Sequence, residues 1–218
     1  MFGKAKLEKS TGIIAAAWIA AAMGIGFTTQ DAGAAEPSDT RTMAYVSVGE
    51  NTRAPIGWQQ FCHDYAADCA GPVSEAVDVQ LTKGAFKEME RVNRYVNDHV
   101  KPMTDLEHYG VVEKWTYPDD GYGDCEDYVL LKRKMLMQAG WPRGALLITV
   151  VRDKKGEGHA VLTVRTDKGE YILDNQEDEI LAWSDTGYHF VKRQSQTDAN
   201  IWVSLGDNRP TKYVAGTR

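Results

Sequence analysis

The spacing of apolar residues changes along the chain, from helical in the first half to strand-like in the second. Between residues 83 and 99, apolar positions recur every three or four residues, which predicts an amphipathic helix with Thr82 as its N-cap. Pro102 follows and stops it. Residues 124–139 are apolar on most sides, so we expect a helix buried in the core. A shorter helix is expected over residues 58–67.

After residue 140 the pattern becomes that of short strands. β-Branched runs at 145–151, 159–165 and 170–174 are separated by turns rich in glycine and aspartate, which predicts an antiparallel meander. Weaker strands are expected near 188–192 and 201–204. The predicted fold class is therefore α+β, with helices first and an antiparallel sheet second.

Two segments show no clear periodicity. Residues 36–57 are expected to form an extended, mobile lead-in, and residues 103–123 a long loop with aromatic anchors. Loops of this length in compact domains are often functional. Because no repeat or linker interrupts the rest, residues 58–218 are expected to form one domain.

The N-terminal residues have the layout of a secretory signal peptide. Three lysines precede an apolar stretch over residues 12–27, and small residues with an A-x-A pattern follow at 32–34. The alternative is a permanent membrane anchor, but 16 apolar residues fall short of the roughly 20 needed to span a bilayer. We therefore expect residues 1–35 to be cleaved, with a mature chain starting near Ala35 or Glu36 that is periplasmic or secreted.

Composition excludes several classes of protein. The chain has 218 residues, of which 43% are hydrophobic and 26% charged, which is typical of a globular protein rather than a disordered or coiled-coil one. The formal net charge is −6, and no long stretch rich in lysine and arginine interrupts this acidic balance. Nucleic-acid binding is therefore disfavoured.

The three cysteines fall into a pair and a single residue. Cys62 and Cys69 flank a short segment and predict a disulfide, since disulfides persist outside the cytoplasm. A metal site that uses His63 or Asp64 is the alternative, although the second half of a zinc pattern is lacking. Cys125 is left over. It either pairs between chains or is free because its chemistry is needed.

The sequence around Cys125, GYGDCEDY, places the thiol in the first turn of the buried helix. A helix N-terminus carries partial positive charge and free N–H groups, which favour a thiolate and can receive an oxyanion. The neighbouring acids Asp124, Glu126 and Asp127 oppose this by raising the thiol pKa. Asp124 is a natural N-cap, and a hard cation such as Ca²⁺ could use Asp124 and Glu126. The alternative is that these acids are only caps and surface charge.

A base and an orienting group for Cys125 are found in the predicted meander. His159 opens one strand and Asp174 ends the next, so both lie at the same edge of the sheet and can meet. A helix N-terminus facing that edge would complete a Cys–His–Asp triad. The remaining histidines are weaker candidates because none combines a nearby thiol with a carboxylate in register: His63, His99, His108 and His189.

These segments resemble the bacterial transglutaminase-like cysteine proteinases, whose best-known branch is the LapG-type periplasmic proteases. The resemblance rests on GDCEDY, then GHAVL about 35 residues later, then LDN. It implies a papain-like, transglutaminase-type fold with Cys125 as nucleophile, His159 as base and Asp174 as the group that orients the histidine.

The resemblance also implies partners. In the adhesin-releasing branch, calcium at acids flanking the cysteine supports activity, and these match Asp124 and Glu126. That branch cuts a large surface adhesin and is sequestered by a cyclic-di-GMP-controlled inner-membrane receptor. No organic cofactor is expected.

Three hypotheses follow from the sequence. The first is an exported cysteine endopeptidase that acts on a protein or peptide through a Cys125 thioester. The second is a transglutaminase or amidase that uses the same triad for another acceptor. The third is a non-catalytic module that binds calcium or a peptide.

Overall fold

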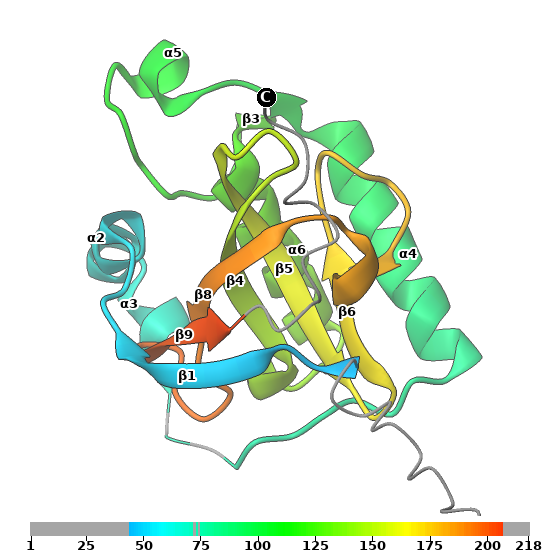
Figure 1. The fold of residues 1–218 in the computed structure, drawn as a ribbon. Helices are drawn as coiled ribbons and strands as arrows, with labels where there is room; N and C mark the ends of the chain where they lie inside the picture. The colour runs from blue at the N-terminus through cyan, green and yellow to red at the C-terminus, as the bar shows by residue number, and fades with distance from the viewer. Residues whose placement is uncertain (1–43, 72, 74, 207–218) are drawn as a thin grey trace, which may run out of the picture. The chain divides into compact units, whose positions relative to one another are not determined.

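Seven strands form one sheet in the computed structural model, which describes residues 44–71, 73 and 75–206 (Figure 1). The strand order is β1-β9-β8-β4-β5-β6-β7, and each neighbouring pair is antiparallel. The predicted order, helices first and antiparallel sheet second, is confirmed for the main body of the fold. The strands are β1 (Ser47–Thr52), β4 (Leu146–Arg152), β5 (Gly158–Thr166), β6 (Gly169–Leu173), β7 (Leu181–Ala182), β8 (His189–Gln194) and β9 (Trp202–Gly206).

The two long helices, α4 and α6, form a layer beside this sheet. Helix α6 packs against β5, and α4 packs against α6 (Figure 1). Thr82 caps α4 as predicted, because its hydroxyl accepts a hydrogen bond from the Ala85 N–H at 3.1 Å. Within the described part of the chain, no helix is long and apolar enough to cross a membrane. The helices are α2 (Ile56–Asp64), α3 (Ala66–Cys69), α4 (Lys83–His99), α5 (Asp105–Tyr109) and α6 (Cys125–Gln138).

The central strands are buried on both faces. Ile148 of β4 and Leu162 of β5 belong to the core that the helices cover, while Val151 and Val161 belong to a second cluster on the opposite face. Trp183 belongs to that second cluster. Burial on both sides explains why these strands appear in the sequence as short continuous apolar runs.

Two expectations about irregular segments need correction. Residues 47–52 of the expected lead-in form β1, which pairs with β9 in the sheet, and α2 already begins at Ile56. Most side chains of β1 are exposed, so this edge strand has no alternating apolar pattern in the sequence. The expected loop 103–123 contains the five-residue helix α5, which is too short to show a helical period.

Helix α5 begins with a capping box. The Thr104 hydroxyl accepts a hydrogen bond from the Glu107 N–H, and the Glu107 carboxylate accepts one from the Thr104 N–H. The pattern T-x-x-E is the sequence signature of such a helix start. This pattern at residues 104–107 is the feature of the sequence from which α5 could have been predicted.

The expected disulfide is present between Cys62 and Cys69. It links α2 to α3, and because both sulfurs are bonded to each other, neither is available for the alternative metal site. His63 and Asp64 are exposed. The disulfide therefore has a structural role, because it joins two short helices.

An aromatic cluster fixes the segment that leads to Cys125. Trp115 packs edge-on against Trp58 of α2 and Trp202 of β9. Gly57 lies directly beneath the Trp115 indole, since a Cβ at that position would be 2.2 Å from the ring. Residues before α6 are thus held against α2 and the sheet.

Candidate active site

Helix α6 begins at Cys125, with Asp124 at the N-cap position. The preceding turn is tight, because a Cβ on Gly123 would lie 2.6 Å from the Asp127 carboxylate. That carboxylate accepts hydrogen bonds from the Thr116 N–H at 2.9 Å and the Asp124 N–H at 3.4 Å. Asp127 therefore fixes the chain on both sides of the turn that delivers the thiol.

His159 and Asp174 are in contact, as predicted. His159 is the second residue of β5, and Asp174 follows the last residue of β6, so both lie at one edge of the sheet. His159 Nε2 lies 2.8 Å from Asp174 Oδ1, and both side chains are buried. Asp174 Oδ1 also accepts a hydrogen bond from the Gln176 N–H at 3.0 Å.

The hydrogen bonds to Asp174 decide its ionisation. Burial acts to raise the pKa of Asp174, but the hydrogen bond and charge of His159, together with the bonds from Gln176 and Tyr188, outweigh burial. The pKa is held below its usual value. Asp174 is therefore an ionised acceptor that fixes the imidazole.

Cys125 reaches the same edge of the sheet. Helix α6 packs against β5, and the backbone N–H of Ala160, the residue after His159, acts to lower the pKa of the Cys125 thiol. The thiol is free and partly exposed. The first turn of α6, which carries the free thiol, therefore lies on the helix that packs against β5, the strand of His159.

The acids beside Cys125 outweigh the expected effect of the helix N-terminus. The pKa of the thiol lies well above its usual value because of burial and the adjacent charge of Glu126. The thiol also donates a hydrogen bond to Glu126 Oε2 at 3.1 Å, which favours the protonated form. The expectation of a lowered thiol pKa is therefore not met by the protein groups alone.

Three carboxylates cluster beside the thiol: Asp105, Asp124 and Glu126. One oxygen from each lies within 4.8 Å of the others. Asp105 and Glu126 are buried, and burial together with the neighbouring charges raises the pKa of Asp105 and brings that of Glu126 to about 9. Asp105 comes from α5, so the sequence pattern around Cys125 did not identify it.

The cluster fits a hard cation. Asp124 Oδ2 accepts a hydrogen bond from the Asp105 N–H at 3.3 Å, but the buried Oδ1 of Asp124 has no donor among the described residues. Carboxylate oxygens are the ligands that Ca²⁺ prefers, and a divalent cation would offset the charge of three acids. The alternative role as caps holds in part, because Asp124 and Asp127 form the capping box of α6, but capping leaves Oδ1 of Asp124 without a donor.

Tyr188 is a site residue that the sequence did not identify. Its hydroxyl donates a hydrogen bond to Asp174 Oδ2 at 2.6 Å, and its ring meets the His159 imidazole edge-on, with centroids 5.8 Å apart. Tyr188 precedes β8, two strands away from β5 in the sheet. No local pattern in the sequence points to this contact.

Comparison with known proteins matches residues 48–210 to the family described as bacterial transglutaminase-like cysteine proteinase BTLCP. The chain belongs to this family. Its members are cysteine peptidases with a transglutaminase-like fold.

Solved structures of Legionella pneumophila LapG are also similar to the chain. The calcium-bound form is 27% identical, covers 56% of this chain and 71% of its own, and has a TM-score of 0.47. The EGTA-treated form is 26% identical, with the same coverages and a TM-score of 0.46. The comparison with curated proteins gives no match.

The histidines other than His159 either contact other groups or are exposed. His99 Nδ1 lies 2.7 Å from the Tyr95 carbonyl, and His108 Nε2 lies 2.8 Å from Asp120. His189 is exposed, as is His63. Trp115, in the loop before the cysteine, donates its indole N–H to Glu113 Oε1 at 2.7 Å, so that donor is already engaged.

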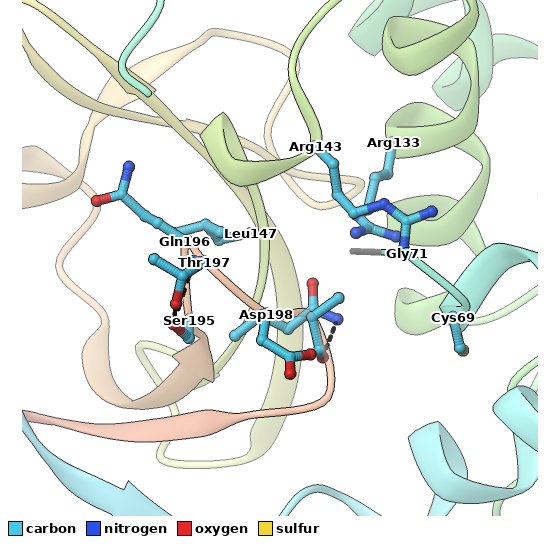
Figure 2. A pocket seen from close by; sticks show the side chains of 11 residues that line it. Cys69, Gly71, Arg133, Arg143, Leu147, Ser195, Gln196, Thr197 and Asp198 are labelled. Atoms are coloured by element: carbon cyan, nitrogen blue, oxygen red, sulfur yellow. Dashed lines mark hydrogen bonds between the residues drawn. The ribbon is translucent and has the colours of Figure 1, made fainter. Parts of the chain in front are cut away.

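A separate hollow is lined by residues from the far end of α6 and from the segment after β8 (Figure 2). Arg133, Arg143 and Asp198 contribute to it, and none of the three triad candidates does. The Arg133 Nε–H donates to the Leu146 carbonyl at 3.0 Å. This hollow is therefore separate from the site around Cys125.

Replacing Tyr188 with phenylalanine removes the hydroxyl bond to Asp174 and keeps the ring. We expect the free energy of unfolding at pH 7 to fall by about 1.5–3 kcal/mol, because a buried hydrogen bond to a charged group is lost. The depressed pKa of Asp174 contributes stability at neutral pH that is lost as the pH falls through that pKa. The difference in unfolding free energy between the wild type and Tyr188→Phe should therefore be smaller in acid than at pH 7. Urea unfolding at pH 7 and in acid measures both.

Tyr171→Phe is the matched control, because no hydrogen bond to the Tyr171 hydroxyl occurs within the described residues. It should change stability little at either pH. An equal loss for Tyr188→Phe at both pH values would contradict a bond to the ionised carboxylate.

Proposed function

We propose that the protein is an exported cysteine endopeptidase in which Cys125, His159 and Asp174 form the catalytic triad. The observation that carries this proposal is a buried His159–Asp174 pair on the strand against which α6 packs: α6 begins with the free thiol of Cys125, and the Ala160 N–H, next to His159 in the chain, acts to lower the pKa of that thiol. Membership of a cysteine peptidase family supports the reaction class.

Each residue has a role that follows from its contacts. With Nε2 engaged by Asp174, His159 has Nδ1 available for proton transfer, and the Gln176 side-chain amide lies 3.5 Å from that nitrogen. Cys125 attacks the peptide carbonyl, and His159 takes the thiol proton and delivers it to the leaving amine. The N–H groups of the first turn of α6 stabilise the oxyanion.

Water then attacks the Cys125 thioester, with His159 again as base, and releases the acid product. Transfer of the acyl group to a primary amine, as in a transglutaminase, uses the same steps up to the thioester, and an amidase uses them to hydrolyse another kind of amide. A fluorescent primary amine included in the assay separates these two outcomes. Its incorporation into the substrate in place of hydrolysis would favour acyl transfer.

We expect Cys125→Ala and His159→Ala each to lower kcat by about 10⁴-fold or more, because the nucleophile or its base is lost. Asp174→Asn should cost about 10⁴-fold, because the imidazole loses the acceptor that orients it. Cleavage of a peptide library by purified protein measures this, with circular dichroism to establish folding.

His99→Ala is the control, since His99 is exposed at the end of α4. It should keep the activity of the wild type. Substantial turnover by folded Cys125→Ala would rule out the triad, and equal thiol reactivity in the wild type and His159→Ala would favour a non-catalytic binding module.

We also propose that Asp105, Asp124 and Glu126 hold calcium. Support comes from their convergence and from the unpartnered buried oxygen of Asp124. Bound calcium would supply positive charge next to Cys125. Without such charge, Asp124 raises the pKa of Asp105 and of Glu126, and Glu126 and Asp124 raise the pKa of the thiol.

Calcium at about 100 times its Kd should raise the free energy of unfolding by about 2.7 kcal/mol. Glu126→Gln and Asp124→Asn should reduce this gain, because each removes a charged ligand, and a chelator should lower peptidase activity of the wild type. Calorimetric titration and thermal unfolding measure the effect. Glu90→Gln, on the exposed face of α4, should respond to calcium as the wild type does; no calcium response in the wild type would contradict the site.

Export is proposed from the signal-peptide pattern of residues 1–35, which lie outside the described residues, and is supported by the disulfide. N-terminal sequencing of protein from the periplasm or culture medium should give Ala35 or Glu36 as the first residue. Full-length protein confined to the cytoplasm would contradict export. A surface adhesin as substrate and an inner-membrane receptor as regulator stay predictions drawn from the family resemblance.

A further inference from the structure

The two ring nitrogens of His159 have different partners. Nε2 lies 2.8 Å from Asp174 Oδ1. The side-chain amide nitrogen of Gln176 lies 3.5 Å from Nδ1, and it is the only hydrogen-bond partner of that nitrogen among the described residues. His159 is only 4% exposed, whereas Gln176 is exposed. The Gln176 side chain therefore contacts the buried ring from its solvent side.

These partners decide where the proton of the ring lies. Because Asp174 is ionised, it accepts a hydrogen bond and keeps a proton on Nε2 of His159. In a neutral imidazole the other nitrogen, Nδ1, then carries a lone pair and can only accept. The Gln176 amide N–H is thus the donor in this contact, and it favours the tautomer in which Nδ1 has no proton. A base that takes a proton at Nδ1 needs this tautomer.

Gln176 contacts both members of the buried pair. Its backbone N–H donates to Asp174 Oδ1 at 3.0 Å, and its side chain reaches His159. The first bond fixes the carboxylate, and the second fixes the ring that the carboxylate holds. Because the main-chain bond does not depend on the side chain, a substitution of Gln176 changes the contact with Nδ1 and leaves the bond to Asp174.

The charged groups around His159 favour the protonated ring. Asp174 is in direct contact, and the charge of His159 acts to lower the pKa of Asp153, so this attraction also favours the imidazolium. Helix α6, which packs against β5, adds Asp124 at its N-cap and Glu126 in its first turn. An imidazolium cannot take a proton from a thiol. The side-chain amide acts in the opposite direction, because a donor bonds only an unprotonated Nδ1.

The thiol does not compete for this nitrogen in the resting site. Cys125 donates its hydrogen bond to Glu126 Oε2 at 3.1 Å. The amide contact of 3.5 Å is at the long end of hydrogen-bond distances, so it is a weak bond that a better donor can replace. Gln176 therefore holds the ring in place and releases Nδ1 when the thiol proton is transferred.

We propose that Gln176 is a positioning residue: its side-chain amide holds His159 in the orientation and tautomer in which Nδ1 acts as a base. The role rests on the proposed peptidase function, because Gln176 acts through His159 and not on substrate. It contributes to kcat, since the step that needs Nδ1 is the transfer of the thiol proton.

Two substitutions separate a hydrogen-bond donor from a side chain that only fills space. Gln176→Ala removes the amide, and we expect kcat to fall about 3- to 10-fold, as is typical for the loss of one neutral hydrogen bond. Gln176→Glu keeps the size and replaces the donor with a carboxylate, which favours a proton on Nδ1. Here kcat at pH 7 should fall about 100-fold or more, a typical contribution of a general base. The variant of equal size should thus be the poorer enzyme.

Nitrogen-15 NMR of the His159 ring gives a second measurement, which needs no substrate. At pH 7 the wild type should show a proton on Nε2 and none on Nδ1. In Gln176→Ala the Nδ1 resonance should move toward that of a nitrogen without a hydrogen bond. In Gln176→Glu the resonance should be that of a protonated Nδ1.

Gln60, which is exposed on α2, supplies the matched controls. Gln60→Ala and Gln60→Glu make the same chemical changes away from His159 and should keep the kcat and the ring resonances of the wild type. Circular dichroism establishes that each variant is folded.

Three results would overturn the proposal. A higher kcat in Gln176→Glu than in Gln176→Ala would mean that the side chain only fills space. An unchanged Nδ1 resonance in folded Gln176→Ala would mean that the bond is absent. Failure of both Gln176 variants to fold would mean that the residue serves the fold.

The two measurements separate this inference from the proposed function. If the wild type cleaves no peptide while both Gln176 variants change the Nδ1 resonance as expected, the peptidase function fails and the contact with His159 stands. If the wild type is an active peptidase and Gln176→Ala changes neither kcat nor the resonance, the positioning role fails and the peptidase function stands.

Discussion

The site depends on keeping one buried carboxylate ionised. Asp174 is almost fully enclosed, and burial alone would favour its neutral form, which accepts hydrogen bonds poorly. Donors from three places prevent this: His159 on β5, the backbone of Gln176 and the hydroxyl of Tyr188. The edge of the sheet, the chain at residues 174–176 and the start of β8 must all be in place before the imidazole is fixed.

The first turn of α6 presents the opposite problem. Here negative charge is in excess, since Asp105, Asp124 and Glu126 converge and Glu126 accepts the thiol hydrogen bond. The partial positive charge of a helix N-terminus is too small to offset three acids. Cation binding is a physical solution to this imbalance, and it would act on the thiol and the fold together.

Helix α6 connects these two regions. Its first residue carries the thiol, and it packs against β5, the strand that carries His159. The helix packs against β5 and α4, and four of its charged side chains are buried: Glu126, Asp127, Lys132 and Arg133.

The sequence alone determined the main helices, the central meander, the disulfide and the His159–Asp174 contact, because each depends on local periodicity or on strand ends joined by a short turn. It did not reveal β1, whose pairing with β9 joins the two ends of the described chain, or α5, which brings Asp105 to the acids beside Cys125. The contact of Tyr188 with Asp174 likewise joins the start of β8 to the end of β6. Only the tertiary structure decided these features, because a residue's partners across a sheet or between helices leave no periodic signal in its own segment.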